Sequence, residues 1–284
     1  MARICPLFSG STGNSTYIGT RHGGILVDAG ASARALCEAL ERAGGSCEEI
    51  AAIAVTHHHI DHIKGLKPML KKTGAVLIAS VKTAEALADA DKIPVGTRVI
   101  TLDENSSAAE NVTPAAGSLN ASESENHITE AAGTAVSRFA TSHDCVGSGG
   151  FVFTLPDGRK IAVCTDLGVV TDGVRRALRG CDTVLIESNH DIEMLKNGPY
   201  PPELKLRIMS ESGHISNNAC AAELPGLLMS GTKRIILGHL SLKNNLPMLA
   251  KSCAEAALID IGAENGRDYL LTVAAPSENR VTVL

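Results

Sequence analysis

Short apolar runs alternate with amphipathic stretches along most of this chain. In the first half, runs rich in β-branched residues predict strands, and helical periodicity predicts the segments between them. The expected strands cover about residues 3–8, 14–18, 24–27, 50–55, 75–79 and 98–102, and the expected helices about 32–43, 61–72 and 81–89. Successive strands followed by β-α alternation are typical of a layered α/β fold.

The second half resumes this alternation after an irregular span. Its expected strands cover about residues 135–141, 150–155, 160–164, 183–186, 234–237 and 269–273, and its expected helices about 172–179, 192–196, 202–209, 217–229 and 246–258. Residues 103–134 lack periodicity and are rich in Ala, Ser, Glu, Asn and Gly, so we expect a mobile surface insertion there, with His127 in solvent. We expect a single domain over residues 1–284 that carries this insertion.

The composition indicates which residue types form the core and how a nucleic acid could bind. Hydrophobic residues make up 44% of the 284 residues but aromatic residues only 2%, so the core must consist of Ala, Val, Ile and Leu, as in a sheet covered by helices. The net charge of -5 provides no overall basic field, and a nucleic acid would have to bind a local patch.

Cysteine usage and hydropathy bear on the compartment. Eight cysteines are scattered without a C-x-x-C pair, and we interpret them as buried free thiols of a cytosolic protein. The sequence shows no signal peptide and no apolar run long enough to span a membrane. We therefore expect a cytoplasmic protein that does not bind membranes.

A cluster of metal-binding side chains follows the apolar run 50–55, in the sequence THHHIDH at residues 56–62. On an extended tip, residues two apart point the same way, so His57 and His59 can bind one ion together. Asp61 and His62 open the next helical stretch, where adjacent side chains diverge, and this divergence suits a second ion. A polar loop that merely contains histidines is the alternative, and three His with one Asp at this spacing argue against it.

Three further candidate ligands stand just past apolar strands. They are His143, Asp166 and His239. In layered α/β proteins, functional loops gather at the ends of strands. Each residue alone is typical of an ordinary loop, but the recurrence of the same placement indicates that the three converge on the histidine stretch.

This succession of H-x-H-x-D-H, His, Asp and His resembles the metallo-β-lactamase superfamily, whose fold is an αββα sandwich with a two-metal site. More narrowly, the segments FSGSTGNS (8–15), THHHIDHIKG (56–65), SHD (142–144) and GHLSLKNN (238–245) look like the YycJ/WalJ branch of bacterial 5′-to-3′ exodeoxyribonucleases, which are linked to DNA repair. The resemblance spans nearly the whole chain and implies an α/β fold of two mixed β-sheets flanked by helices. One departure is His58, where we expect an acidic residue in that branch.

The resemblance also implies a ligand set for two divalent metal ions. It assigns His57, His59 and His143 to one ion, Asp61, His62 and His239 to the other, and Asp166 as a bridge between them. Five imidazoles and two carboxylates suit Zn²⁺ or Mn²⁺ better than Mg²⁺ or Ca²⁺. Two such ions would share a hydroxide as the nucleophile, because each lowers the pKa of bound water toward about 7.

The bridging position narrows the reaction. A carboxylate rather than a cysteine at position 166 argues against one main group of β-lactamases and fits thioesterases, lactonases and nucleases. The run GHISNNACAAEL (213–224) resembles a segment of the tRNA 3′-processing endonucleases, in which a His pairs with a Glu that ends an upstream strand. This resemblance predicts His214, oriented by Glu187, as a general acid or phosphate clamp, and we count Asp61 with them as catalytic. Ser212 stands where those enzymes have an Asp.

Candidate substrate contacts lie in loops near these residues. Glycines in the loop 9–15 permit a phosphate to approach backbone N–H groups. The candidate substrate-binding residues are Ser11, Asn14, His190, Ser241, Asn244 and Asn245.

We therefore expect a metal-dependent phosphodiesterase, first of all a 5′-to-3′ exonuclease that acts on DNA in preference to RNA, with DNA-repair proteins as partners. Three alternatives stay open: a small-molecule ester hydrolase of the thioesterase or lactonase type, an RNA-processing nuclease, and a non-catalytic metal-binding regulator. The complete ligand set argues against the last, because a degenerate relative usually loses ligands.

Overall fold

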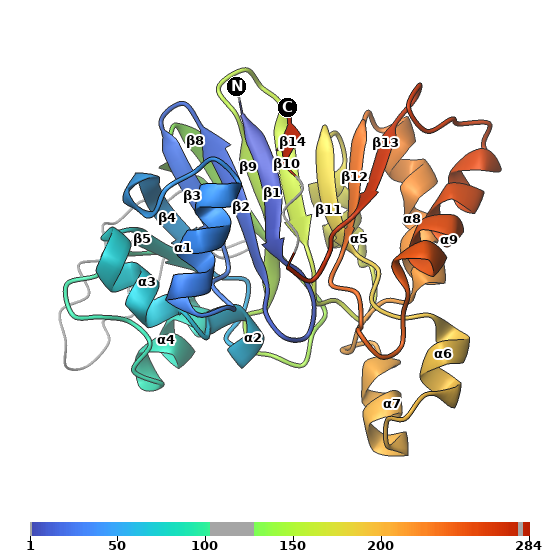
Figure 1. Cartoon of the computed structure of the whole chain (residues 1–284), viewed down its shortest axis with the longest axis horizontal. Helices are drawn as coiled ribbons and strands as arrows, with labels where there is room; N and C mark the ends of the chain where they lie inside the picture. The colour runs from blue at the N-terminus through green and yellow to red at the C-terminus, as the bar shows by residue number, and fades with distance from the viewer. Residues whose placement is uncertain (1, 103–127, 278–280) are drawn as a thin grey trace.

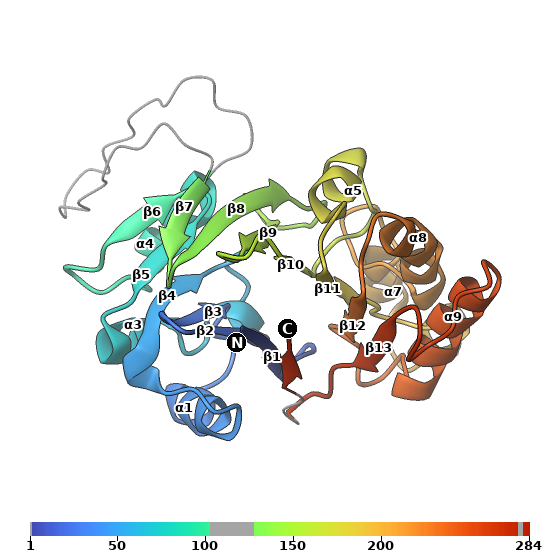
Figure 2. The ribbon, with the colours of Figure 1, turned by 90° about the horizontal axis from the view of Figure 1, so that it is seen from above.

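Two mixed β-sheets pack face to face between two layers of helices in the computed structural model, which describes residues 2–102, 128–277 and 281–284 (Figures 1 and 2). The predicted α/β sandwich is thereby confirmed. No helix in these ranges is both long enough and apolar enough to cross a membrane.

The first sheet has the strand order β14-β1-β2-β3-β4-β5-β6. Its strands are β1 (Arg3–Phe8), β2 (Ser15–Thr20), β3 (Gly23–Val27), β4 (Ile50–Ala54), β5 (Val76–Ala79), β6 (Val99–Thr101) and β14 (Thr282–Val283). Short turns join β1 to β3 as antiparallel neighbours, whereas β3 to β6 run parallel. The helical segments of this half are α1 (Ala33–Arg42), the 3₁₀ turn η1 (Cys47–Glu49), α2 (Ile60–Ile63), α3 (Leu66–Thr73) and α4 (Val81–Asp89).

The second sheet has the strand order β13-β12-β11-β10-β9-β8-β7. Its strands are β7 (Ile128–Ala131), β8 (Thr134–Ala140), β9 (Gly149–Thr154), β10 (Lys160–Cys164), β11 (Thr183–Glu187), β12 (Arg234–Gly238) and β13 (Leu270–Val273). Here β7 to β10 are antiparallel and β10 to β13 are parallel. The helices of this half are α5 (Asp172–Leu178), α6 (Ile192–Asn197), α7 (Pro202–Ile208), α8 (Asn217–Met229) and α9 (Pro247–Ile259).

Three apolar clusters hold the layers together. The middle cluster joins the facing sides of the two sheets, with Ile25 and Ile78 from the first sheet and Phe151 and Leu185 from the second. The two outer clusters pack α1, α3 and α4 on the first sheet and α5, α8 and α9 on the second. Aliphatic residues dominate all three clusters, as the low aromatic content predicted.

The topology brings several loops to one edge of the sandwich. β8 is antiparallel to β9, which is antiparallel to β10, so β8 and β10 end at the same edge of their sheet. The parallel strands β10, β11 and β12 end there as well. In the first sheet, β3 and β4 are also parallel to each other. The candidate ligands follow the carboxyl ends of these strands.

The helix expected over residues 61–72 is wrong in one respect, because the chain forms two helices, α2 and α3, that meet at Gly65. The Gly65 N–H donates to the carbonyl of Ala29 at 2.8 Å. A Cβ at Gly65 would lie 2.1 Å from the carbonyl oxygen of Ala31. The chain therefore packs too closely against the loop after β3 for an ordinary helix to continue.

Two other expectations need correction. Cys37 and Cys47 form a disulfide that links α1 to η1, so these two are not free thiols. The other six cysteines are free, and all of them except Cys253 are buried. Residues 128–131 form β7 and pair with β8, so the irregular span ends earlier than position 134. The rest of that span, including His127, lies outside the described residues.

Candidate metal centre

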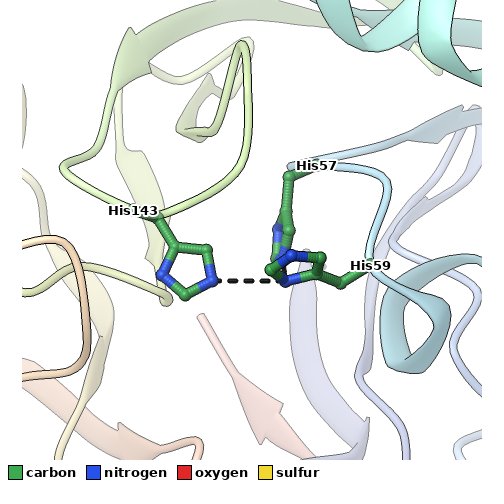
Figure 3. Close-up of side chains that lie close together, drawn as sticks. All are labelled: His57, His59 and His143. Carbon is green, nitrogen blue, oxygen red and sulfur yellow. Dashed lines mark hydrogen bonds between the residues drawn. The ribbon is translucent and has the colours of Figure 1, made fainter. Parts of the chain in front are cut away.

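Three histidines converge at the edge where β4 and β8 end, and we call them the His57 triad: His57, His59 and His143. Their rings point toward one another from two loops (Figure 3). His57 Nε2 lies 3.1 Å from His59 Nδ1, and His59 Nδ1 lies 3.3 Å from His143 Nε2. Ligand atoms of all three lie within 4.8 Å of one another, which is close enough to hold one cation.

A second group, the His62 triad, comprises Asp61, His62 and His239. Asp61 and His62 lie on α2, and His239 follows β12, so the group joins the two sheets. Its ligand atoms also lie within 4.8 Å of one another. His62 Nε2 is 3.6 Å from Asp61 Oδ2.

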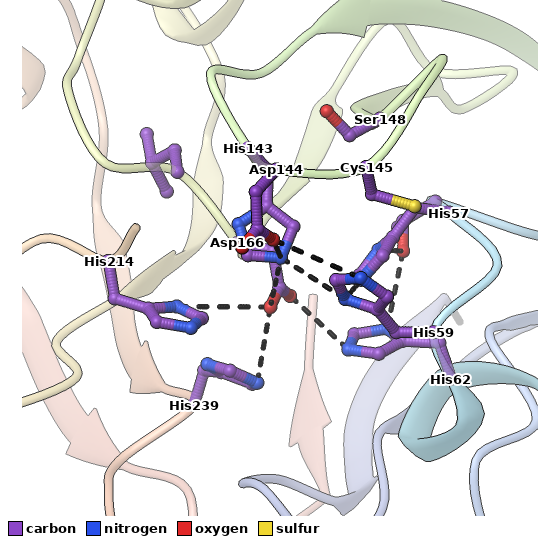
Figure 4. A network of polar contacts seen from close by, with 12 residues as sticks. His57, His59, His62, His143, Asp144, Cys145, Ser148, Asp166, His214 and His239 are labelled. Carbon is purple, nitrogen blue, oxygen red and sulfur yellow. Dashed lines mark hydrogen bonds and ion pairs between the residues drawn. The ribbon is translucent and has the colours of Figure 1, made fainter. Parts of the chain in front are cut away.

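Asp166 lies between the two triads, just past β10 (Figure 4). Its Oδ2 is 3.3 Å from His62 Nε2, and its Oδ1 is 3.4 Å from His239 Nε2 and 3.8 Å from His143 Nε2. The carboxylate is buried, and the surrounding histidine charges hold its pKa well below the usual range although burial itself would raise it. Asp166 is therefore an anion that faces ligand atoms of both triads.

The donor set fits divalent cations. Buried polar atoms are almost always hydrogen-bonded, yet Asp166 Oδ2 and His239 Nε2 are buried and make no hydrogen bond to any residue that the structure describes. Both atoms point into the space shared by the triads, where a cation would give them a partner. The predominance of imidazole nitrogen over oxygen suits a transition metal or zinc better than magnesium or calcium.

Backbone conformation at this edge is unusual for residues other than glycine. Asp28, Asp166 and His239 have φ values of 64°, 61° and 56°. Each follows a strand directly or by two residues, and each lies at the centre. Left-handed conformations are uncommon for such residues and persist where the surrounding structure determines them, often at functional sites.

Asp28 is a residue that sequence reasoning missed. It follows β3 and accepts hydrogen bonds from the Thr56 N–H at 2.8 Å and the Thr56 hydroxyl at 2.9 Å. The same carboxylate lies 2.8 Å from His62 Nδ1. A carboxylate at Nδ1 fixes the tautomer of a metal-binding histidine and leaves Nε2 for the metal. The only sequence signal was the position of Asp28 at a strand end, which it shares with the other candidates.

Glu187 likewise places a carboxylate at the Nδ1 atoms of two histidines. It ends β11, is fully buried, and its Oε1 lies 2.7 Å from His214 Nδ1 and 2.8 Å from His239 Nδ1. Its Oε2 accepts the Leu167 N–H at 3.1 Å. Burial would raise the pKa of Glu187, but the His214 charge and the histidine hydrogen bonds lower it to about 2. The structure thus brings together Glu187 and His214, as the sequence predicted.

His214 lies beside the metal centre rather than within either triad. Its Nδ1 is 3.9 Å from Asp166 Oδ1, and its ring stacks on that of His239 with 5.2 Å between centroids. Burial would lower the pKa of His214, but Glu187 raises it above the usual value. A raised pKa favours the protonated ring, which can donate a proton.

The predicted substrate-binding residues lie in different parts of the site. Asn14 lies at the centre, where its Nδ2 is 3.0 Å from His62 Nε2 and 3.3 Å from Asp61 Oδ2, and Ser11 is exposed on the same loop. Asn14 therefore contacts candidate ligands, a role that the sequence did not indicate.

The candidate residues that follow His239 are buried. Asn245 is buried, and its side chain bonds the carbonyls of Ser188 and Asn189 and the side chain of Asn217. The Ser241 hydroxyl accepts the Asn244 N–H at 3.2 Å, and the Asn244 side chain is buried. The structure thus places Ser241, Asn244 and Asn245 in buried positions within the protein, and their contact with substrate stays a prediction.

His190 occupies an intermediate place. It is buried, its backbone pairs with Ser216, and its Nδ1 makes no hydrogen bond within the described part of the chain. Burial lowers the pKa of His190 to about 4, although Glu187 opposes this effect. His190 is therefore neutral at pH 7, and its contact with substrate stays a prediction.

The chain belongs to the β-lactamase superfamily, since the family model for a β-lactamase superfamily domain matches residues 24–240. The exodeoxyribonuclease YycJ of Bacillus anthracis is 34% identical over 264 residues, which cover 93% of this chain and 91% of that protein. The exodeoxyribonuclease WalJ of Streptococcus pneumoniae serotype 2 is 35% identical over 278 residues, which cover 95% of this chain and 93% of that protein. The family resemblance that the sequence indicated is confirmed.

A solved structure shows the same fold at lower identity. Zn(2+)-bound PqqB from Methylobacterium extorquens superposes with a TM-score of 0.66 at 16% identity, covering 99% of this chain and 100% of that one. This likeness concerns the fold alone.

Proposed function

We propose that this protein is a metal-dependent phosphodiesterase that degrades DNA from the 5′ end toward the 3′ end. The observation that carries the proposal is the meeting of two ligand triads at Asp166, with the Glu187–His214 pair alongside. The two relatives named exodeoxyribonucleases support this choice, because the alignments cover more than nine-tenths of this chain.

The centre would hold two divalent ions, Zn²⁺ or Mn²⁺. The His57 triad would bind one ion, the His62 triad the other, and Asp166 both, with Asp61 as a partly buried carboxylate of the second position. When bound, such ions would activate a water molecule as the nucleophile at neutral pH and would neutralise the charge that develops on phosphate oxygens.

The chain itself supplies the proton for the departing sugar oxygen. The Nδ1 of His214 is bonded to the Glu187 carboxylate, so Nε2 is the ring nitrogen left for the substrate. The Glu187 charge raises the pKa of His214, which favours the protonated ring, and it also orients the ring. Glu187 thus acts through His214 and His239, whereas His214 would meet the leaving group.

The remaining assignments follow from a DNA substrate. We propose that Ser11 and Asn14 line the approach to the metal centre, that the protein works in the cytoplasm, and that it acts with DNA-repair proteins. We also propose that residues 1–284 act as one domain, since the middle apolar cluster joins both sheets.

One experiment tests reaction and substrate together. The purified protein, analysed for bound metal, is incubated with 5′- and 3′-labelled single- and double-stranded DNA, with RNA, and with a small thioester. We expect mononucleotide release from the 5′ end of DNA only when Zn²⁺ or Mn²⁺ is bound. Turnover of the thioester with intact DNA would contradict the proposal in favour of an ester hydrolase, and cleavage of RNA alone would favour an RNA-processing nuclease.

A further inference from the structure

The arm formed by α6 and α7 projects from the body of the second half of the chain (Figure 1). No residue of α7 is buried, and Leu206 on it is 67% exposed. The helix therefore gains little from apolar packing, and polar contacts must fix its position.

Those contacts lead directly to the metal centre. The Ile208 carbonyl accepts the His214 N–H at 2.9 Å, and the Asp144 N–H donates to the carbonyl of Ser212 at 3.0 Å. The carbonyl of Gly213 lies 3.1 Å from His143 Nδ1. The turn after α7 is thus bonded to the loop that carries His143, and this bonding places α7 beside the His57 triad.

Arg207 lies on α7 and contacts the loop that carries His143. Its Nε donates to Asp144 Oδ2, while Asp144 Oδ1 lies 3.5 Å from His143 Nε2 and 3.9 Å from His59 Nε2. The Arg207 side chain is 55% exposed, and within the described part of the chain its two terminal nitrogens make no hydrogen bond. One edge of the guanidinium is therefore free beside the His57 triad, at a position that we call the mouth of the centre.

We propose that Arg207 binds a backbone phosphate of the DNA strand that enters the centre. This inference rests on the proposed function and names a substrate-binding residue for it. A guanidinium presents paired N–H donors that match two phosphate oxygens, so it binds phosphate with defined geometry. Asp144 holds the side chain at the mouth until a phosphate accepts the free N–H groups.

The charge of the surroundings supports this role. Asp61 and Asp166 face the metal ions, whereas Asp144 lies outside both triads and repels a phosphodiester that approaches the His57 triad. A cation at the mouth offsets that repulsion. An exposed ion pair such as Arg207–Asp144 contributes little to stability. A purely structural role in fixing α6 and α7 therefore explains Arg207 poorly.

The test compares Arg207→Ala and Arg207→Lys with the parent protein. Loss of a charged hydrogen bond predicts that Arg207→Ala raises the KM for labelled DNA about 10- to 100-fold, with metal content and kcat nearly unchanged. Lysine keeps the charge without the paired geometry and should restore part of the loss. The slope of log KM against log salt should fall by about 0.7 to 0.9 in the alanine variant, as for one phosphate contact.

The matched control is Arg267→Ala. Arg267 is an exposed arginine that pairs with Glu264 and Asp268 in the segment before β13, at the opposite edge of the sheet. Its replacement should leave both KM and the salt slope unchanged. An equal effect of the two alanine variants would overturn the inference, because loss of net positive charge would then explain it.

A second pair of variants tests whether Arg207 acts by binding phosphate or only by pairing with Asp144. Arg207→Ala is repeated in an Asp144→Asn background, where the ion pair no longer exists. A KM increase that persists there supports direct contact with DNA, and one that disappears overturns the inference. Absence of DNA cleavage by the metal-loaded parent protein would contradict the proposed function itself, whereas normal cleavage with an unchanged KM in Arg207→Ala would contradict only the inference.

Discussion

The two candidate metal positions use similar ligands but carry different charge before a metal binds. In the His57 triad, burial lowers the pKa of His57 far below its ordinary value and that of His59 below it, so both rings are neutral at pH 7. In the His62 triad, burial acts in the same direction, but Asp166 and the carboxylates behind the rings raise the pKa of His62 to about 9 and that of His239 to about 10.

The groups that contact Nδ1 add to the effect of Asp166. The His57 ring meets the Thr56 hydroxyl at 3.0 Å, and His143 meets the carbonyl of Gly213. His62 and His239 instead meet the buried carboxylates of Asp28 and Glu187. A carboxylate makes imidazole a more basic ligand but also retains a proton while no metal is present. The first position is therefore ready for a metal, whereas the second must release protons.

The largest effect is expected where the two positions meet. In Asp166→Asn, both triads lose their shared anion, and DNA cleavage should fall more than about 100-fold, since even residues behind the ligands contribute 10- to 100-fold. Metal analysis by mass spectrometry should show fewer bound ions per chain. Unchanged metal content would contradict the assignment of Asp166 as a bridge, and circular dichroism controls for misfolding.

A large effect without metal loss is expected at His214, which belongs to neither triad. Replacing it with Asn removes the proton donor, so kcat should fall by about 100- to 1,000-fold while both ions stay bound. The acidic limb of the pH–rate profile should stay in place, and the basic limb, set by loss of the His214 proton, should disappear. The exposed His22→Asn variant serves as control, and loss of metal in His214→Asn would show that the residue is a ligand instead.

The third prediction compares how metal affinity at the two triads depends on pH. His62 and His239 are protonated at pH 7 in the metal-free protein because their pKa values are about 9 and 10. Binding at the His62 triad should release protons, so its affinity should rise up to about 100-fold from pH 7 to pH 8 if both leave. Binding at the His57 triad should change less with pH, because burial lowers the pKa of His57 and His59 below the ordinary value. Calorimetry in buffers of different ionisation enthalpy counts the protons, and equal release at both steps would remove the distinction.

The raised pKa values of His62 and His239 also predict how the stability of the metal-free protein changes with pH. A pKa raised from 6.5 to about 9 or 10 stabilises the fold below about pH 6.5, and this contribution is lost as pH rises through 9 to 10. Thermal unfolding of the chelator-treated protein should therefore begin at lower temperature at pH 9 than at pH 6.5.

The contrast between the triads also marks the limit of sequence reasoning. The alternation of apolar runs predicted nearly every strand, and the spacing of His57, His59, Asp61 and His62 predicted their proximity because these residues are neighbours along the chain. His143, Asp166 and His239 were found through their placement after strands, a consequence of topology. Local geometry and topology are the two kinds of information that a single sequence expresses directly.

The groups behind the ligands were harder to predict. Asp28 contacts His62 only because β3 and β4 are parallel neighbours, so that both strands end at the same edge. Asn244 and Asn245 follow a ligand in sequence, but loop packing turns their side chains inward. The break at Gly65 and the disulfide between Cys37 and Cys47 likewise depend on contacts between segments that pack in three dimensions.

The smallest predicted effect tests the contrast most directly, through Asp28→Asn. Asparagine tolerates the left-handed backbone at position 28, where φ is 64°, so the loop should fold. Its amide keeps an acceptor for Thr56 but removes the charge beside His62. Metal affinity at the His62 triad should fall about 10- to 100-fold, the usual effect of losing such a partner.

The His57 triad should be unaffected in this variant, because no ligand of that triad contacts Asp28 among the described residues. Calorimetric titration of the metal-free protein should then show one weakened step and one unchanged step, with fewer protons released at the weakened one. Thr56 is the residue through which the substitution could weaken metal binding at the His57 triad, since its hydroxyl contacts both Asp28 and His57. Equal weakening of both steps would therefore mean that Thr56 couples the positions, and that the two triads are one cooperative site rather than two unequal ones.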